Sequence, residues 1–159
     1  MLPFESLQVS RMMPILYAED EPDDIFFMER AFKEAAIEQP LYSVADGEEV
    51  IAYLSGAGQY ADRTQYPLPG LILLDINMPQ MSGLDVLKWI RATPAVSTIP
   101  VLVLSSSSHE KDVQRASLLG ANGYLTKPGQ PDRLVEIVKA FRDYWLVHDY
   151  LAERQAQPN

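Results

Sequence analysis

Short apolar runs recur along the chain and predict five buried strands. Each run holds four or five residues, mostly aliphatic or aromatic, and is continuously apolar rather than alternating with polar positions. Runs of this kind are typical of strands in a parallel sheet that is covered on both faces. The predicted strands are residues 15–18, 41–45, 71–74, 101–104 and 123–126.

Helix-start signals separate these runs. A polar residue that can accept a hydrogen bond from the first turn precedes most of the predicted helices. The predicted caps are Asp23 or Asp24, Asp46, Ser82 and Ser107, with Pro131 at the first position of the last helix and Gly120 closing the fourth. Strand–helix alternation repeated five times predicts a doubly wound α/β fold, with a parallel sheet and helices on both faces.

Composition excludes several classes of protein. Apolar residues make up 47% of the 159 residues and charged residues 22%, as in ordinary globular domains. The net charge of −9 disfavours nucleic acid as a partner, and the absence of cysteine excludes disulfides and thiolate metal sites. The sequence contains neither a signal-peptide pattern nor an apolar run long enough to cross a bilayer. We therefore expect a cytoplasmic protein that does not engage membranes.

Reactive side chains follow four of the five predicted strands. Glu19 and Asp20 follow the first, Asp75 the third, Ser105 the fourth and Lys127 the fifth. The carboxyl ends of parallel strands meet at one edge of the sheet, which is where ligands bind in such folds. Taken singly, each residue is more often a helix cap or turn residue. The prediction of a functional site therefore rests on their convergence at the same edge.

Three carboxylates and an ammonium group suit phosphoryl transfer. Glu19, Asp20 and Asp75 would repel one another if all were ionised, and a hard divalent cation such as Mg²⁺ or Mn²⁺ relieves this repulsion. An ionised Asp75 is a competent nucleophile toward phosphorus. Lys127 and the Ser105 hydroxyl can meet the charge on the transferred group.

Four segments stand in a characteristic order and spacing: LYAEDEPDD, LILLDINMPQMSGLDVL, PVLVLSSSS and GANGYLTKP. Together they resemble the receiver domain of two-component response regulators, over about residues 14–141. The resemblance implies a flavodoxin-like sheet of order 2-1-3-4-5. It also implies that Asp75 accepts a phosphoryl group from a phosphohistidine of a sensor histidine kinase. A Glu-Asp acid pair in place of Asp-Asp, and Ser in place of Thr, preserve the chemistry.

The same resemblance assigns roles to individual residues. The implied metal ligands are Asp20, Asp75, the Asn77 carbonyl and Glu19, the last acting largely through a metal-bound water. The implied phosphoryl-binding and switch residues are Ser105, Ser106, Lys127 and Tyr124. Gly83 and Pro128 are structural, and the Lys127–Pro128 bond is expected to be cis. Phosphorylation would draw Ser105 inward, bury Tyr124, and change the face formed by the fourth helix, fifth strand and fifth helix.

Two other function classes remain as alternatives. A phosphohydrolase of the haloacid dehalogenase type also forms an aspartyl phosphate, but it needs an acidic residue two positions after the nucleophile. Here that position is Asn77, so we expect slow autodephosphorylation rather than enzymatic turnover. The second alternative is an interaction module that uses the fold without phosphorylation.

The last predicted helix extends beyond the receiver domain. The expected organisation is an extension over 1–13, the domain over 14–141, and the helix end and tail over 142–159. A helix from 131 to 152 would be roughly 33 Å long, more than the domain can cover. Its exposed aromatics predict a homodimer, against the alternative of a tail folded back on its own domain. The candidate interface residues are Phe141, Tyr144, Trp145, His148 and Leu151.

The extension and the long 55–70 connection resemble the stand-alone receivers that are paired with bacterial phytochrome kinases. The sequence carries no recognisable output segment, so we expect output through a partner or a histidine phosphotransfer protein.

Overall fold

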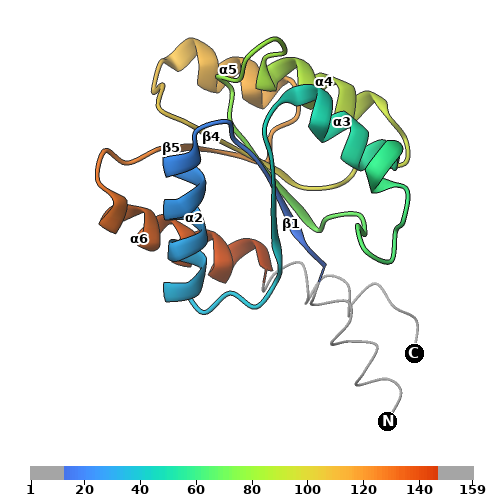
Figure 1. Ribbon diagram of the computed structural model, residues 1–159. Coiled ribbons are helices and arrows are strands. Elements are labelled where there is room, and N and C mark those ends of the chain that lie inside the picture. Colours follow the sequence, from blue (N-terminus) through green and yellow to red (C-terminus); the bar gives the residue numbers. More distant parts are fainter. Residues whose placement is uncertain (1–12, 147–159) are drawn as a thin grey trace, which may run out of the picture.

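A five-stranded parallel sheet lies between two layers of helices in the computed structural model, which describes residues 13–146 (Figure 1). The strand order is β2-β1-β3-β4-β5, which confirms the predicted fold class and topology. The strands are β1 (Ile15–Ala18), β2 (Leu41–Val44), β3 (Leu71–Leu74), β4 (Val101–Ser105) and β5 (Gly123–Thr126).

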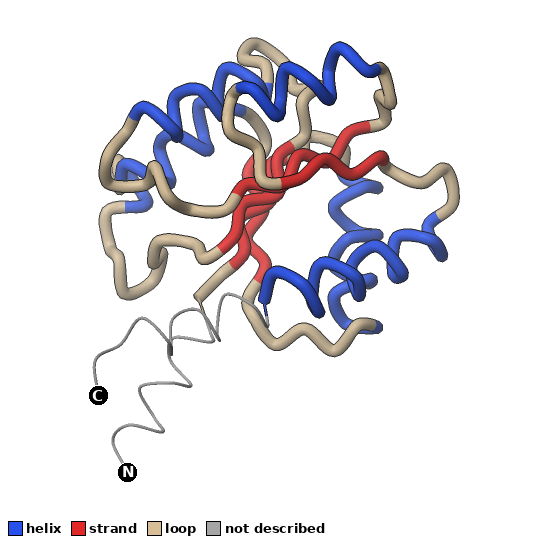
Figure 2. Tube along the Cα trace, turned by 180° about the vertical axis from the view of Figure 1, so that it is seen from behind, coloured by secondary structure: helices blue, strands red, loops and turns tan. Residues whose placement is uncertain are grey.

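Helices cover both faces of the sheet, as the views from the front and from behind show (Figures 1 and 2). Two helices pack on one face and three on the other. The pair is α2 (Pro22–Glu34) and α6 (Pro131–Phe141), and the three are α3 (Gly47–Ser55), α4 (Gly83–Ala92) and α5 (Glu110–Leu118). A 3₁₀ turn, η1 (Gly58–Tyr60), lies in the connection to β3, and a π-helical turn, η2 (Arg142–Leu146), follows α6.

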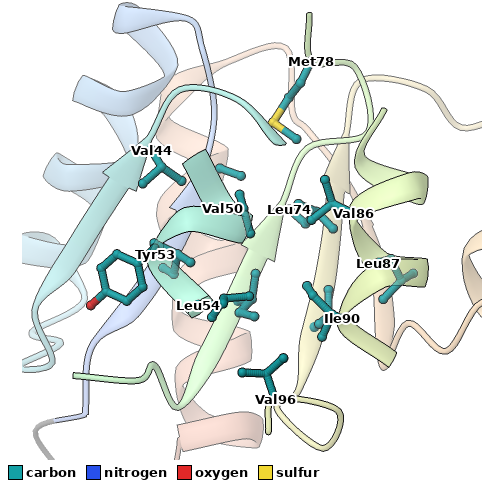
Figure 3. Packing of buried hydrophobic residues seen from close by; sticks show 14 of the residues in the cluster. Val44, Val50, Tyr53, Leu54, Leu74, Met78, Val86, Leu87, Ile90 and Val96 are labelled. Atoms are coloured by element: carbon teal, nitrogen blue, oxygen red, sulfur yellow. The ribbon is translucent and has the colours of Figure 1, made fainter. Parts of the chain in front are cut away.

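The central strands supply both cores because successive side chains point to opposite faces of a sheet. On one face, Leu16 of β1 and Leu74 of β3 belong to a cluster with residues of α3 and α4. Figure 3 shows Leu74 in this cluster together with Val50 and Val86. On the other face, Tyr17 and Leu73 pack against α2 and α6. Both faces of these strands are therefore buried, as the continuous apolar runs predicted.

Two predicted helix caps are present. The Asp46 side chain accepts a hydrogen bond from the Glu49 amide at 2.8 Å, and Ser82 accepts one from the Leu84 amide at 3.1 Å. Glu49 also accepts from the Ala45 amide at 2.9 Å, one residue before the position that a standard capping box uses. These caps fix where α3 and α4 begin after β2 and β3.

Two other predicted helix starts are wrong. The N-cap of α2 is Glu21 rather than Asp23 or Asp24, because Pro22 is favoured at the first helical position. The N-cap of α5 is His109 rather than Ser107. Ser107 instead donates from its hydroxyl to Asp112 at 2.6 Å, so its side chain braces the turn without capping it.

The α-helical part of the last helix ends at Phe141. Phe141 is only 4% exposed and its ring lies 5.9 Å from that of Phe32, so it belongs to the core and not to an exposed dimer face. Tyr144 is 56% exposed, and Trp145 packs partly against the α2–α6 core. His148, Leu151 and the rest of the predicted extension lie outside the described residues. Within 13–146, no helix has the length and apolar character needed to span a membrane.

Candidate functional site

The carboxyl edge of the sheet brings the predicted residues together. The parallel register pairs Ala18 with Leu74, so Glu19 and Asp75 leave neighbouring strands side by side. Lys127 enters the same edge directly after β5, and its amide donates to the Ser105 carbonyl at 2.7 Å. Residues up to 108 positions apart in sequence thus meet through strand register alone.

The Lys127 ammonium is the centre of the site. It donates to Glu19 Oε1, to Asp75 Oδ2 at 2.9 Å and to Asp24 Oδ2 at 3.1 Å. An ammonium carries three N–H donors, so these three carboxylates use all of them. The cluster balances one cation against three acids, which leaves a strongly negative site.

Glu19 is completely buried, and both of its carboxylate oxygens are occupied. Oε1 accepts from Lys127 and from the Tyr17 hydroxyl at 3.3 Å. Oε2 accepts from the amides of Asp20 and Glu21, at 3.1 and 3.2 Å. Four donors therefore anchor this carboxylate, and its main contact at the site is with the ammonium.

Asp75 is almost completely buried and accepts one hydrogen bond on each oxygen. Oδ1 accepts from the Asn77 amide at 3.0 Å, and Oδ2 accepts from Lys127. The chain turns sharply behind it, where the Gly83 amide donates to the Ile76 carbonyl at 2.9 Å. A Cβ at position 83 would lie 2.2 Å from the Asp75 carbonyl oxygen, so this turn requires glycine.

Burial and charge perturb the titration of this cluster. Burial raises the pKa of the Glu19 carboxyl, as does the charge of Asp75, while the hydrogen bond from Lys127 opposes the increase. Burial alone would lower the pKa of Lys127, but its hydrogen bonds to Glu19 and Asp75 outweigh that effect and raise it. Burial, followed by the charge of Glu19, raises the pKa of the Tyr17 hydroxyl. Lys127 is therefore a permanent cation at the site.

The acidic residues fit a hard divalent cation. Glu19, Asp20 and Asp75 each offer a carboxylate oxygen within 4.8 Å of the others. Asp20 lies nearer the surface, and no described residue donates a hydrogen bond to its carboxylate. Mg²⁺ favours one or two carboxylates together with water. Asp20 and the remaining lone pairs of Asp75 suit that set better than Glu19, whose oxygens are already engaged.

The predicted switch residues form a hydrogen-bonded chain beside the acceptor. Ser105 is fully buried, and its hydroxyl accepts from the Ser107 amide at 3.1 Å. The half-buried Tyr124 donates from its hydroxyl to the Ser107 carbonyl at 2.7 Å. Ser107 therefore connects the two residues, although neither side chain touches the other through a hydrogen bond. Ser106, by contrast, is exposed.

The expected cis Lys127–Pro128 bond is wrong, since the described residues contain no cis peptide. A trans X–Pro bond is the default unless its surroundings impose the other isomer, and here the trans chain still delivers Lys127 to the site. Pro128 lines a pocket of about 110 Å³ between α2, β4 and the start of α6. Phe27, Leu104 and Leu134 supply its apolar walls, and Asp24 with Lys127 its polar side.

Two residues of the site were not predicted from the sequence. Asp24 was interpreted only as a helix cap, and Tyr17 only as part of a strand. Signals for both exist: Asp24 lies four residues after Asp20, one helical turn away, and Tyr17 shares a strand face with Glu19. Neither signal distinguishes a site residue from an ordinary solvated acid or a core tyrosine.

Comparison with known proteins agrees with this geometry. The model of the response regulator receiver domain matches residues 15–139. Response regulator Rcp1 of Synechocystis sp. is 36% identical over 132 residues, which cover 83% of this chain and 88% of Rcp1.

Two solved structures are similar over 84% of this chain and 94% of their own. The phosphorylated cyanobacterial phytochrome response regulator RcpA has a TM-score of 0.78 at 36% identity. The Mn²⁺-bound form of Rcp1 has a TM-score of 0.76 at 35% identity. With the family model matching 125 of 159 residues, the chain belongs to the response regulator receiver domain family.

Proposed function

We propose that the chain accepts a phosphoryl group on Asp75 from a sensor histidine kinase and signals through the resulting conformational change. The observation that carries this proposal is the 2.9 Å contact between Asp75 and Lys127, within an acidic cluster at the carboxyl edge of the sheet. This contact supports the proposal because it joins a buried carboxylate to a permanent cation, beside acidic residues that are compatible with a metal ion.

The chemistry follows from the contacts of the acceptor. One Asp75 oxygen forms a bond to phosphorus as the bond between phosphorus and the imidazole nitrogen of the donor breaks, and that nitrogen keeps the electron pair. The Asn77 amide and Lys127 orient the carboxylate, and the ammonium meets the charge of the transferred group.

Asp20, Asp75 and the Asn77 carbonyl would hold Mg²⁺ or Mn²⁺, with Glu19 reaching it through water. The bound cation supplies charge neutralisation for the phosphoryl oxygens. The occupied oxygens of Glu19 support its indirect role.

The proposed switch acts through Ser107. When the Ser105 hydroxyl donates to a phosphoryl oxygen, the loop that carries Ser107 moves with it, and the Tyr124 hydroxyl loses its carbonyl partner or follows it inward. The bonds from Ser107 to Ser105 and from Tyr124 to Ser107 support this coupling. The affected face consists of α5, β5 and α6. It would relay the signal to a partner or a phosphotransfer protein, with no enzymatic turnover beyond slow autodephosphorylation.

The partner kinase is proposed to be a phytochrome. The relative RcpA is described as a phytochrome response regulator, and the similarity to it covers 84% of this chain. A homodimer through the region after Phe141 is also proposed, supported by the exposure of Tyr144. A monomeric mass at micromolar concentration in both phosphorylation states would contradict that assembly.

Labelling by acetyl phosphate in the presence of Mg²⁺ tests the proposed function. We expect the wild type to acquire one phosphoryl group and Asp75→Asn to acquire none, because the amide is not a nucleophile toward phosphorus. Asp62→Asn, in the exposed part of the 55–70 connection, is the matched control and should label like the wild type. Equal labelling of Asp75→Asn and the wild type would refute Asp75 as the acceptor.

A further inference from the structure

Asp24 is the one partner of Lys127 that strand register does not place at the site. It lies in the first turn of α2, accepts from the ammonium at 3.1 Å, and lines the 110 Å³ pocket beside it. It belongs neither to the acidic group that can share a metal ion nor to the acceptor. Its contact with Lys127 therefore needs a separate explanation.

A phosphoryl group on Asp75 needs a cation close to its oxygens, and the Lys127 ammonium is the side-chain cation that the described part of the chain brings to the site. The transferred group brings oxygens whose charge needs a cation, and all three N–H donors of Lys127 are already in use. To contact a phosphoryl oxygen, the ammonium has to leave one of its three carboxylates.

The three carboxylates differ in the free-energy cost of losing their contact with the Lys127 ammonium. The Glu19 side chain is 1% exposed, and a buried carboxylate deprived of its cation is costly. Asp75 loses its carboxylate charge in the acyl phosphate, but it carries the phosphoryl group, so an ammonium that moves to that group stays beside this residue and moves relative to the other two carboxylates. The Asp24 side chain is 42% exposed and faces the pocket, so water can replace the ammonium there at little cost.

We propose that Asp24 is a positioning residue that restrains the Lys127 ammonium in the unphosphorylated protein and releases it to the incoming phosphoryl group. The inference rests on the proposed function of Asp75. The restraint is part of the barrier to phosphoryl acceptance, so Asp24 slows the transfer. Once the group is attached, the released ammonium pairs with it.

With acetyl phosphate as donor, one Asp75 oxygen bonds to phosphorus while the bond between phosphorus and the acetate oxygen breaks. Acetate leaves with the electron pair, and no proton passes through Asp24. Asp24 acts only through the position of Lys127.

The chain contains a matched control for the local charge. Asp23 is the neighbouring acid in the same helical turn, is exposed, and makes no ion pair with a described residue. Asp23→Asn and Asp24→Asn remove the same charge from nearly the same place. Only Asp24→Asn removes a partner of Lys127. The difference in phosphorylation rate between the two variants therefore measures the effect of the contact between Asp24 and Lys127.

The first test measures phosphorylation of the full chain against acetyl phosphate concentration, with Mg²⁺. We expect Asp24→Asn to raise the maximal rate about two- to fivefold, the factor that the free energy of one exposed ion pair supplies. The increase in maximal rate in Asp23→Asn should be less than half of the increase in Asp24→Asn. Asp24→Glu keeps the carboxylate and should have the wild-type maximal rate. The half-saturating donor concentration should change equally in the two asparagine variants. An unchanged or lower maximal rate in Asp24→Asn, or an equal increase in Asp23→Asn, would overturn the proposal.

The second test needs neither metal nor donor. The NMR signal of the Lys127 ε-methylene should shift in Asp24→Asn and stay within the spectral noise in Asp23→Asn, because only Asp24 contacts the ammonium. An unshifted signal in Asp24→Asn would overturn the contact itself. Absence of labelling in the wild type would instead defeat the proposed function, so the two failures are distinguishable.

Discussion

The two edges of the sheet use cations in opposite ways. At the carboxyl edge, Lys127 bonds three carboxylates. Near the amino ends of β4 and β5, Arg91 bonds the carbonyls of Ser97, Ile99 and Gly120 at 2.7–3.0 Å. It also reaches the Asn122 side chain at 2.8 Å.

Arg63 repeats this pattern in the 55–70 connection. Its guanidinium donates to the carbonyls of Tyr53, Leu54 and Tyr66 at 2.7–3.2 Å and so closes the end of α3. Backbone carbonyls cannot leave without unfolding a segment, whereas carboxylate side chains can change partner. The bonds from Arg91 and Arg63 to carbonyls therefore stabilise the fold. The bonds from Lys127 to carboxylates can instead change partner at the site.

The largest expected effect comes from Gly83→Ala at the carboxyl edge. The new Cβ would lie 2.2 Å from the Asp75 carbonyl oxygen and 2.8 Å from the Ile76 Cα, and backbone atoms cannot move aside cheaply. We expect a loss of about 3 kcal/mol or more in unfolding free energy, measured by urea denaturation. Labelling by acetyl phosphate should fall with it. Gly129→Ala, where a Cβ would meet no atom within 4 Å, should change neither quantity.

Arg91→Ala should separate the two edges most clearly. It leaves three carbonyls without their donor, so the unfolding free energy should fall by about 2–3 kcal/mol. The labelling rate of the folded protein should change by less than about twofold, because the site lies at the other edge. Arg30→Ala, at an exposed pair with Glu34, should cost less than about 0.5 kcal/mol. A large loss of labelling by Arg91→Ala with an unchanged unfolding free energy would contradict the assignment of Arg91 to stability rather than to the site.

Arg63→Ala should have the smallest effect of the three. Arg63 makes three hydrogen bonds, one of them at 3.2 Å, whereas Arg91 makes four, so we expect a loss of about 1–2 kcal/mol in unfolding free energy. Arg63→Lys should recover less than half of that loss, since one ammonium cannot reproduce the planar fork of a guanidinium. Full recovery by lysine would show that charge, and not the bonds to carbonyls, is what this position requires.

The central strands were predictable because burial on both faces leaves a direct trace in sequence, whereas β2 and β5 lie at the edges of the sheet and are only partly buried, so the expectation of burial on both faces is wrong for these two. Residues 15–18, 71–74 and 123–126 are strands as predicted, and the other two strands differ by one residue at an end. The meeting of Glu19, Asp75 and Lys127 followed from parallel topology, since each follows a strand end. Register, once known, fixes which residues share an edge.

The remaining contacts depend on tertiary geometry that local pattern does not encode. Arg91 finds partners 6 to 31 positions away, and which carbonyls it reaches depends on how the α4–β4 and α5–β5 loops pack around the end of α4. The start of α2 was missed because Pro22 competes with two aspartates that look like caps. Asp24 was therefore interpreted only as a helix cap, although it is a direct partner of Lys127.

The weak attachment of α5 has a consequence for exchange with solvent. Of the nine described residues of α5 only Ala116 is buried, and its N-cap makes no side-chain bond, while α4 buries five residues and is capped by Ser82. Local opening costs least where little apolar surface is lost. Amide hydrogens of α5 should therefore exchange for deuterium well before those of α4, and this helix can be displaced without melting the sheet beneath it.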